Sequence, residues 1–108
     1  MTKLSAIVVA HNEEARLDAC LSRLGFADEI VVVLDRCTDT SKSIAEKHGA
    51  RILEGAWPIE GDRHDAGIEA CSGPWVLEID ADEWIGTELA AEIQTAVRED
   101  RFDFHFTP

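Results

Sequence analysis

The sequence is poor in basic residues. It holds 10 Lys and Arg against 22 Asp and Glu, which gives the 108 residues a formal net charge of -12. That balance excludes a basic face for nucleic acid, so we expect no nucleic-acid partner. It also disfavours binding to anionic membrane surfaces. The many carboxylates suit divalent cations instead, because such ions prefer oxygen ligands.

Cysteine is scarce as well. The three are Cys20, Cys37 and Cys71, and their odd number and long spacings exclude a C-x-x-C pair and a disulfide framework. We therefore expect a reducing compartment and a cytoplasmic protein. The apolar run Leu4–Ala10 is too short to span a membrane, and it leads into polar residues rather than a cleavage site. Association with the inner face of the membrane through another segment stays open.

Short apolar runs alternate with helical patterns along the chain. Buried strands are predicted at 4–10, 29–34, 50–53 and 75–79, and an edge strand at 102–106. Helices are predicted at 12–25, 38–49, 62–71 and from 87 onward. The order βαβαβαβαβ indicates an α/β fold, with a mostly parallel, Rossmann-like sheet and helices on both faces. At this length the chain is one domain, residues 1–108.

Polar residues and glycines mark the expected helix ends. Asn12 is expected to cap the first helix, Thr38 or Asp39 the second, and Thr87 the last, because short polar side chains accept hydrogen bonds from the first N–H groups of a helix. Gly49 is expected to end the second helix.

Three predicted strands end in polar segments. "AHNEE" follows the first strand, "DRCTD" the second and "DADE" the fourth. Because all strands of a parallel sheet end on one edge, we expect these segments to meet there. Ligands of open α/β sheets bind beyond that edge. The convergence therefore predicts a ligand site.

The absence of glycine-rich motifs excludes two common types of nucleotide site. A dinucleotide fold needs G-x-G-x-x-G after the first strand, and the turn here contains no glycine. Acids at that helix start repel a pyrophosphate, and no P-loop motif is present. A bound diphosphate then requires a metal bridge. Asp80 and Asp82 lie two apart on an extended segment, so both side chains start on one side and suit Mg²⁺ or Mn²⁺.

Three blocks of the sequence carry a family resemblance: "IVVAHNEEARLDACL", "DEIVVVLDRCTDTSKSIAEKHGAR" and "DRHDAGIEACSGPWVLEIDADEW". Together they resemble the family-two glycosyltransferases of the GT-A fold, and are similar to the small bacterial branch that includes lipopolysaccharide core sugar transferases. The resemblance covers the chain from Leu4 to about Trp84. It implies a nucleotide-sugar-binding core.

The resemblance also implies roles for the matching residues. Asp80 and Asp82 match the D-x-D motif, which holds the divalent metal and the donor diphosphate. Asp35 matches the acid that contacts the nucleobase, and Arg63 lies where a basic residue often approaches the donor. The turn that borders the base and ribose is formed by Ala10, His11, Asn12 and Glu13.

The implied reaction is transfer of a sugar, with inversion, from a nucleotide-diphosphate donor to a glycan or lipid-linked acceptor hydroxyl. The family's catalytic domain is roughly twice this length, and its second half carries the acceptor site and the general base. Residues 1–108 are therefore expected to be a truncated, donor-binding half. The chain alone is expected to bind donor weakly and to catalyse nothing. Its exposed apolar surface predicts a homo-oligomer.

Each site assignment has a structural alternative. Asp82 and Glu83 suit the start of the next helix, as Glu13 and Glu14 suit the start of the first. Asp35 suits a strand-end turn.

Four further residues are interpreted as structural. His11 and His64 suit polar loop positions, and Asp39 is expected to cap a helix. Trp57 is expected to be a hydrophobic plug rather than a lid over the site.

Two other functions stay open. One is a non-catalytic domain that keeps the fold and binds a nucleotide or a partner protein. The other is a nucleotidylyltransferase, which the absence of glycine in "AHNEEAR" disfavours.

Overall fold

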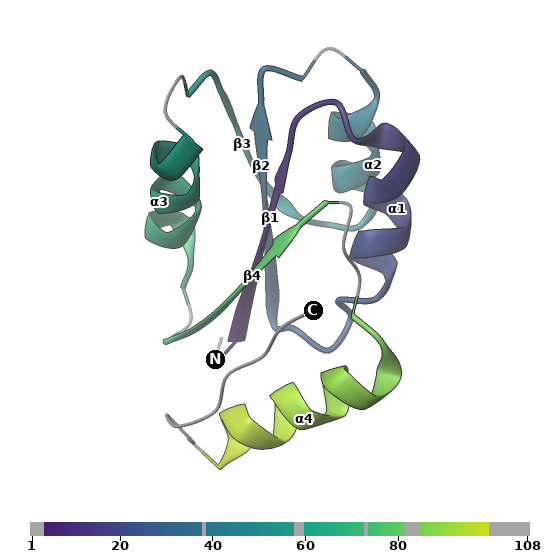
Figure 1. The fold of residues 1–108 in the computed structure, drawn as a ribbon, viewed down its shortest axis with the longest axis vertical. Coiled ribbons are helices and arrows are strands. Elements are labelled where there is room, and N and C mark those ends of the chain that lie inside the picture. The colour runs from purple at the N-terminus through teal and green to yellow at the C-terminus, as the bar shows by residue number, and fades with distance from the viewer. Residues whose placement is uncertain (1–3, 38, 58–59, 73, 82–84, 100–108) are drawn as a thin grey trace.

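Strands and helices alternate along the chain, as predicted (Figure 1). The structure is a computed structural model that describes residues 4–37, 39–57, 60–72, 74–81 and 85–99. The elements are β1 (Leu4–Ala10), α1 (Glu14–Ser22), β2 (Glu29–Asp35), α2 (Ser41–Lys47), β3 (Arg51–Gly55), α3 (Glu60–Ala70), β4 (Trp75–Asp80) and α4 (Thr87–Arg98). The strand predicted at 102–106 lies outside the described residues.

The four described strands form one parallel sheet in the order β3-β2-β1-β4. Every residue of the central strand β1 is buried, since helices cover both of its faces. This explains why its sequence is continuously apolar rather than alternating. Strand β4 has β1 as its one neighbour in the described sheet, and its residues alternate between buried and more exposed.

The predicted caps of the first and last helices are wrong. Asn12 does not cap α1: it adopts a left-handed backbone, with φ of 52°, and Glu13 holds the N-cap position. Asn tolerates this backbone better than most residues. A carboxylate from the next loop, that of Asp39, accepts the N–H of Glu14 in its place. Thr87 is the first residue of α4, and Gly86, in extended conformation, precedes it as the N-cap.

The cap predicted for the second helix, Thr38 or Asp39, is also not at the N-cap position, although Asp39 bonds to the helix start. Thr40 occupies the N-cap position of α2, but Asp39 Oδ1 accepts the N–H of Ser41 at 3.0 Å. Gly49 ends the same helix with φ of 71°, the left-handed conformation that glycine adopts at low cost. Both ends of α2 are therefore encoded locally.

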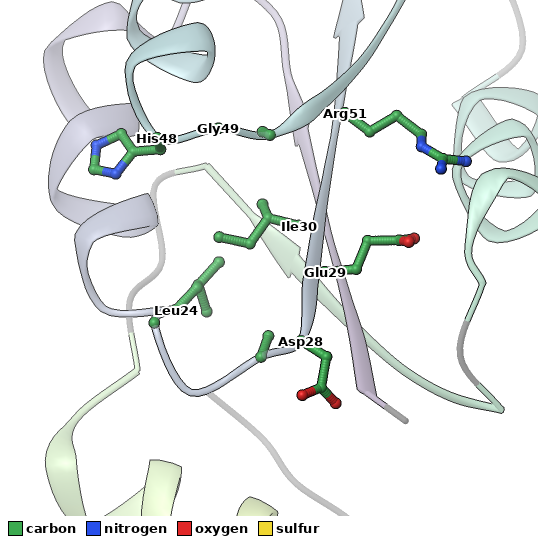
Figure 2. Close-up of a pocket in the computed structure, with 10 residues that line it drawn as sticks. Leu24, Asp28, Glu29, Ile30, His48, Gly49 and Arg51 are labelled. Carbon is green, nitrogen blue, oxygen red and sulfur yellow. The ribbon is translucent and has the colours of Figure 1, made fainter. Parts of the chain in front are cut away.

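A hollow of about 500 Å³ opens at the amino-terminal ends of β2 and β3 (Figure 2). Leu24 and Ile30 point toward each other across it, whereas His48 turns toward α1. The Glu29 and Arg51 side chains point to the other side of the sheet, toward α3. This hollow is at the opposite end of the strands from "AHNEE", "DRCTD" and "DADE".

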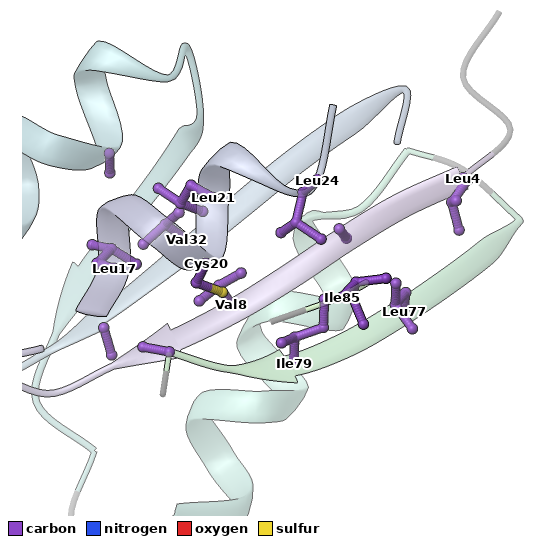
Figure 3. Packing of buried hydrophobic residues seen from close by; sticks show 14 of the residues in the cluster. Leu4, Val8, Leu17, Cys20, Leu21, Leu24, Val32, Leu77, Ile79 and Ile85 are labelled. Carbon is purple, nitrogen blue, oxygen red and sulfur yellow. The ribbon is translucent and has the colours of Figure 1, made fainter. Parts of the chain in front are cut away.

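The core has a larger and a smaller cluster, one on each face of the sheet. The larger joins the even-numbered residues of β1 to α1, with Leu17 and Leu21 among its members (Figure 3). It also includes Ile93 of α4. The smaller consists of Ile7, Val9, Val31 and Val33, with Trp57, Ala70 and Cys71 packed against it. Helices on both faces are thereby confirmed, and Cys20 lies in the larger cluster. Each fully buried Leu, Ile or Val contributes about 1.5–3 kcal/mol.

The three cysteines are free, as expected. Among the described residues no helix has both the length and the apolar character needed to cross a membrane.

Candidate functional site

The strand register brings the predicted segments to one edge. Ala10 pairs with Leu34, so Asp35 ends β2 one residue beyond the end of β1. Val9 pairs with Asp80, so β4 ends beside the end of β1. The connection from β1 leads to β2 on one side, and the connection from β3 returns to β4 on the other. This edge is therefore a topological switch point, where open α/β sheets bind ligands.

The turn after β1 is bonded to the end of β2 through His11. Its Nδ1 lies 2.7 Å from the carbonyl oxygen of Asp35. A carbonyl can only accept, so Nδ1 carries the proton. The rest of the exposed ring lies at the ligand edge. His11 is thus a polar loop group, as interpreted from the sequence, and it fixes the spacing of the two loops.

Cys37 adds a second bond between the same loops. Its Sγ accepts the N–H of Asn12 at 3.3 Å and donates to the carbonyl of Ala10 at 3.4 Å. Burial raises the pKa of Cys37, so the sulfur remains a thiol that can donate. Nothing in the sequence marks Cys37 as part of the site, because a single cysteine in a polar loop carries no pattern.

Glu14 and Asp39 join the two helix starts reciprocally. Glu14 donates its N–H to Asp39 Oδ2 at 3.2 Å, and its own carboxylate accepts the N–H of Thr40 at 3.0 Å and the Thr40 hydroxyl. Burial works against the charged form of Asp39, but hydrogen bonds from Ser41 and Glu14 outweigh it, and the pKa of Asp39 falls below its usual value. Of the two interpretations of Glu14, helix-start acid and donor contact, these bonds support the first.

The side chain of Asp35 is fully buried. Arg36 Nε and Nη2 donate to its two oxygens at 3.0 and 3.2 Å, and the N–H of Trp57 donates to Oδ1 at 3.0 Å. Trp57 itself is half-buried against the smaller core cluster, as expected of a hydrophobic plug. Arg36, like Asn12, has φ of 52°, and these are the two non-glycine residues in the described part with a left-handed backbone. Strained residues of this kind cluster at functional sites.

Asp80 is exposed at the end of β4, beside the turn that contains His11. Its carboxylate fits a Mg²⁺ or Mn²⁺ ion that completes its shell with phosphate oxygens and water. Asp82 lies outside the described residues, and so do the side chains of Arg63 and His64, although α3 contains both. The described residues hold no group of three metal-binding side chains.

Comparison with protein families gives one match. The model of "Glycosyl transferase family 2" matches residues 5–106. An uncharacterized glycosyltransferase of Rickettsia felis is 34% identical over 95 residues, which cover 87% of this chain and 34% of the relative. The lipopolysaccharide core biosynthesis glycosyltransferase LpsC of Rhizobium meliloti is 37% identical over 95 residues, which cover 80% of this chain and 34% of the relative.

Solved structures of GT-A glycosyltransferases share the fold. Glucosyl-3-phosphoglycerate synthase of Mycobacterium tuberculosis, in complex with Mn²⁺, UDP and glucosyl-3-phosphoglycerate, has a TM-score of 0.65 and 28% identity, covering 74% of this chain and 33% of that one. S. aureus TarS has a TM-score of 0.75 over 98% of this chain and 38% of that one, at 23% identity. The chain thus spans about a third of the length of the relatives it matches.

Proposed function

The chain belongs to glycosyl transferase family 2, and from this we propose that it is the donor-binding part of an enzyme that transfers a sugar, with inversion, from a nucleotide diphosphate to an acceptor hydroxyl. The observation that carries the proposal is the convergence of Ala10, Asp35 and Asp80 at the switch point of the sheet. The complex of glucosyl-3-phosphoglycerate synthase with UDP and Mn²⁺ supports a uridine diphosphate as the first nucleotide to test.

The donor would lie across the carboxyl edge of the sheet. We assign its base and ribose to the turn after β1, formed by Ala10, His11, Asn12 and Glu13, and to the end of β2, where the buried Asp35 would act through its neighbour. We assign its diphosphate to the end of β4, through Asp80. Arg63 is proposed to approach the donor from α3, opposite in charge to the phosphates.

Asp80 and Asp82 are proposed to hold a divalent metal, Mg²⁺ or Mn²⁺. When bound, such an ion supplies positive charge that stabilises the departing diphosphate. Without the ion, the carboxylates at this edge would repel the negatively charged diphosphate of the donor. By holding such an ion, Asp80 and Asp82 would orient the donor, and the ion's charge would offset the repulsion.

In the proposed reaction the acceptor oxygen bonds to the anomeric carbon while the bond from that carbon to the diphosphate breaks. A general base takes the proton of the acceptor hydroxyl. No residue of this chain is assigned that role. Because the chain spans about a third of its relatives, we assign the base and the site for a glycan or lipid-linked acceptor to the remainder of such a protein. The three free cysteines support a cytoplasmic location.

Calorimetric titration of the 108-residue chain with UDP and Mn²⁺ tests the proposal. We expect binding that requires the metal and that Asp80→Asn removes. Glu78→Gln is the matched control, since Glu78 is exposed two residues earlier on the same face of β4. Absence of nucleotide binding in the wild-type chain, at any metal concentration, would refute the proposal.

A second candidate is a domain that binds the nucleotide but transfers nothing. It rests on the same convergence of strand ends, which offers a nucleotide site without an assigned general base. Incubation of the chain with UDP-sugars and an acceptor panel separates the two functions, because only an enzyme releases UDP.

A further inference from the structure

The end of β2 presents a cation where the sequence predicts a carboxylate. The side chain of Asp35 has no exposed surface, whereas that of Arg36 is 52% exposed. Both oxygens of Asp35 already accept hydrogen bonds from Arg36, and one also accepts the N–H of Trp57. A ligand that arrives at this edge therefore meets the guanidinium first.

The backbone holds Arg36 in this position. Its left-handed φ of 52° is unfavourable for a residue with a Cβ atom. Two interactions support it: the N–H of Arg36 donates to the carbonyl of Gly55 at 2.8 Å, and the side chain forms the two-point bond to Asp35. Arg36 also borders a hollow of about 310 Å³ beside the end of β2, together with Cys37 and Asp39. Arg36 is thus fixed through both its backbone and its side chain, and it borders a hollow, so it is arranged to contact a ligand.

We propose that Arg36 contacts the donor nucleotide on this side of the site and that Asp35 is a positioning residue that acts through it. The proposal rests on the donor site proposed above. A guanidinium has five N–H groups, and Asp35 takes two of them. The others match acceptor oxygens, so the ligand group is either a carbonyl oxygen of the base or a phosphate oxygen. The positive charge also suits an anion at an edge that carries Asp39 and Asp80.

Direct contact between the nucleobase and Asp35 makes the opposite prediction. Arg36 would then have to leave the carboxylate before the base could bind, and its removal would strengthen binding. Substitution of Arg36 therefore distinguishes the two arrangements: donor affinity falls if Arg36 contacts the donor, and it rises if Asp35 contacts the base directly.

The experiment is calorimetric titration of the 108-residue chain with UDP and Mn²⁺. We expect Arg36→Gln to weaken binding about tenfold or more, as for loss of a charge-assisted hydrogen bond. Arg36→Lys keeps a charge beside the buried Asp35 but loses the planar fork, so it preserves folding and we expect a smaller loss. Arg98→Gln, at the exposed end of α4, is the control for net charge and should bind as the wild type does. Circular dichroism establishes that each variant is folded.

The double variant tests the role of Asp35. If Asp35 acts through Arg36, Asp35→Asn adds no further loss in the Arg36→Gln background. Titration of Arg36→Lys with uridine and with pyrophosphate identifies the contacted oxygen. Weaker binding of uridine indicates a carbonyl oxygen of the base, and weaker binding of pyrophosphate indicates a phosphate oxygen. Variants of Arg36 that bind UDP as tightly as the wild type, or more tightly, would overturn the inference alone. A wild-type chain that binds no nucleotide would overturn the donor site and this inference together.

Discussion

The sulfur of Cys37 lies 3.3 Å from the backbone nitrogen of Asn12, and this contact ties the turn after β1 to the turn after β2. The same thiol donates to Ala10, and His11 reaches the carbonyl of Asp35 from the other side. The two loops that border the proposed base site are thus one bonded unit. Their separation is set by side chains rather than by the sheet alone.

Removal of this thiol should loosen the site. We expect Cys37→Ala to lower the free energy of unfolding by about 1 kcal/mol, since the hydrogen bonds of the thiol to the neighbouring loop are lost at a half-buried position. We also expect weaker UDP binding, because the loops lose their spacing. Urea denaturation and calorimetry measure the two effects. Cys71→Ala is the control. Cys71 follows α3, its thiol donates to the carbonyl of Gly67, and the adjacent Ser72 bonds to Glu29 at the start of β2, the end opposite the ligand edge. Equal UDP affinity in both variants would show that the Cys37 contact does not shape the site.

Asp39 should make stability depend on acid pH. Its pKa in the folded protein lies below the ordinary 3.8, so the folded state binds this proton less readily than the unfolded state does. Its contribution is therefore present above about pH 3.8 and disappears as the pH falls through the lower, folded pKa. Asp39→Asn keeps one acceptor oxygen but can satisfy only one of the N–H groups of Glu14 and Ser41. We expect this variant to be less stable at neutral pH, and the difference from the wild type to shrink as the pH falls through the folded pKa of Asp39. Thermal unfolding between pH 2 and 7 measures the difference, and a constant difference would contradict the assignment.

Gly67 should resist substitution although it lies inside a helix. A Cβ at this position would come within 2.8 Å of Ile7 Cγ2 and 3.1 Å of Val33 Cγ2. Overpacking of this kind costs about 1–3 kcal/mol, against a gain of about 1 kcal/mol in helix propensity. We expect Gly67→Ala to be destabilised. Gly25→Ala, with open space around the new methyl group, should be neutral or slightly stabilised. Urea denaturation compares them, and a stabilised Gly67→Ala would mean that α3 moves away from the sheet without penalty.

The sequence predicted the features that follow from local pattern. The continuous apolar run of β1 reflects burial on both faces, and a parallel sheet then brings the three polar strand ends together. The end of α2 at Gly49 was also found from the sequence, and the bond of Asp39 to the start of this helix likewise depends on neighbours in the chain. These predictions needed no knowledge of which loop lies beside which.

The remaining features depend on partners distant in the chain. Asn12 was expected to cap α1. Instead, the N–H of Glu14 at the start of α1 donates to the carboxylate of Asp39, which lies 25 positions further along the chain. Asp35 was expected to face a ligand, but its side chain is buried and bonds to the N–H of Trp57, 22 positions further on. The sequence shows that a carboxylate ends β2, but not what covers it. The assignment of Asp82 stays a prediction, since this residue lies outside the described part.

Self-association of the chain can be tested at the open side of β4. Val76 is 37% exposed there, Ile68 of α3 is 42% exposed, and in the described sheet β4 pairs with β1 alone. A sheet edge with exposed apolar side chains is a template for pairing with another chain. Sedimentation equilibrium should therefore show association that grows with concentration, and Val76→Lys should weaken it. Gln94→Lys, on the exposed surface of α4, adds the same charge away from this edge and should associate as the wild type does. Monomers at every concentration would refute the prediction, whereas association unaffected by Val76→Lys would place the contact on another surface.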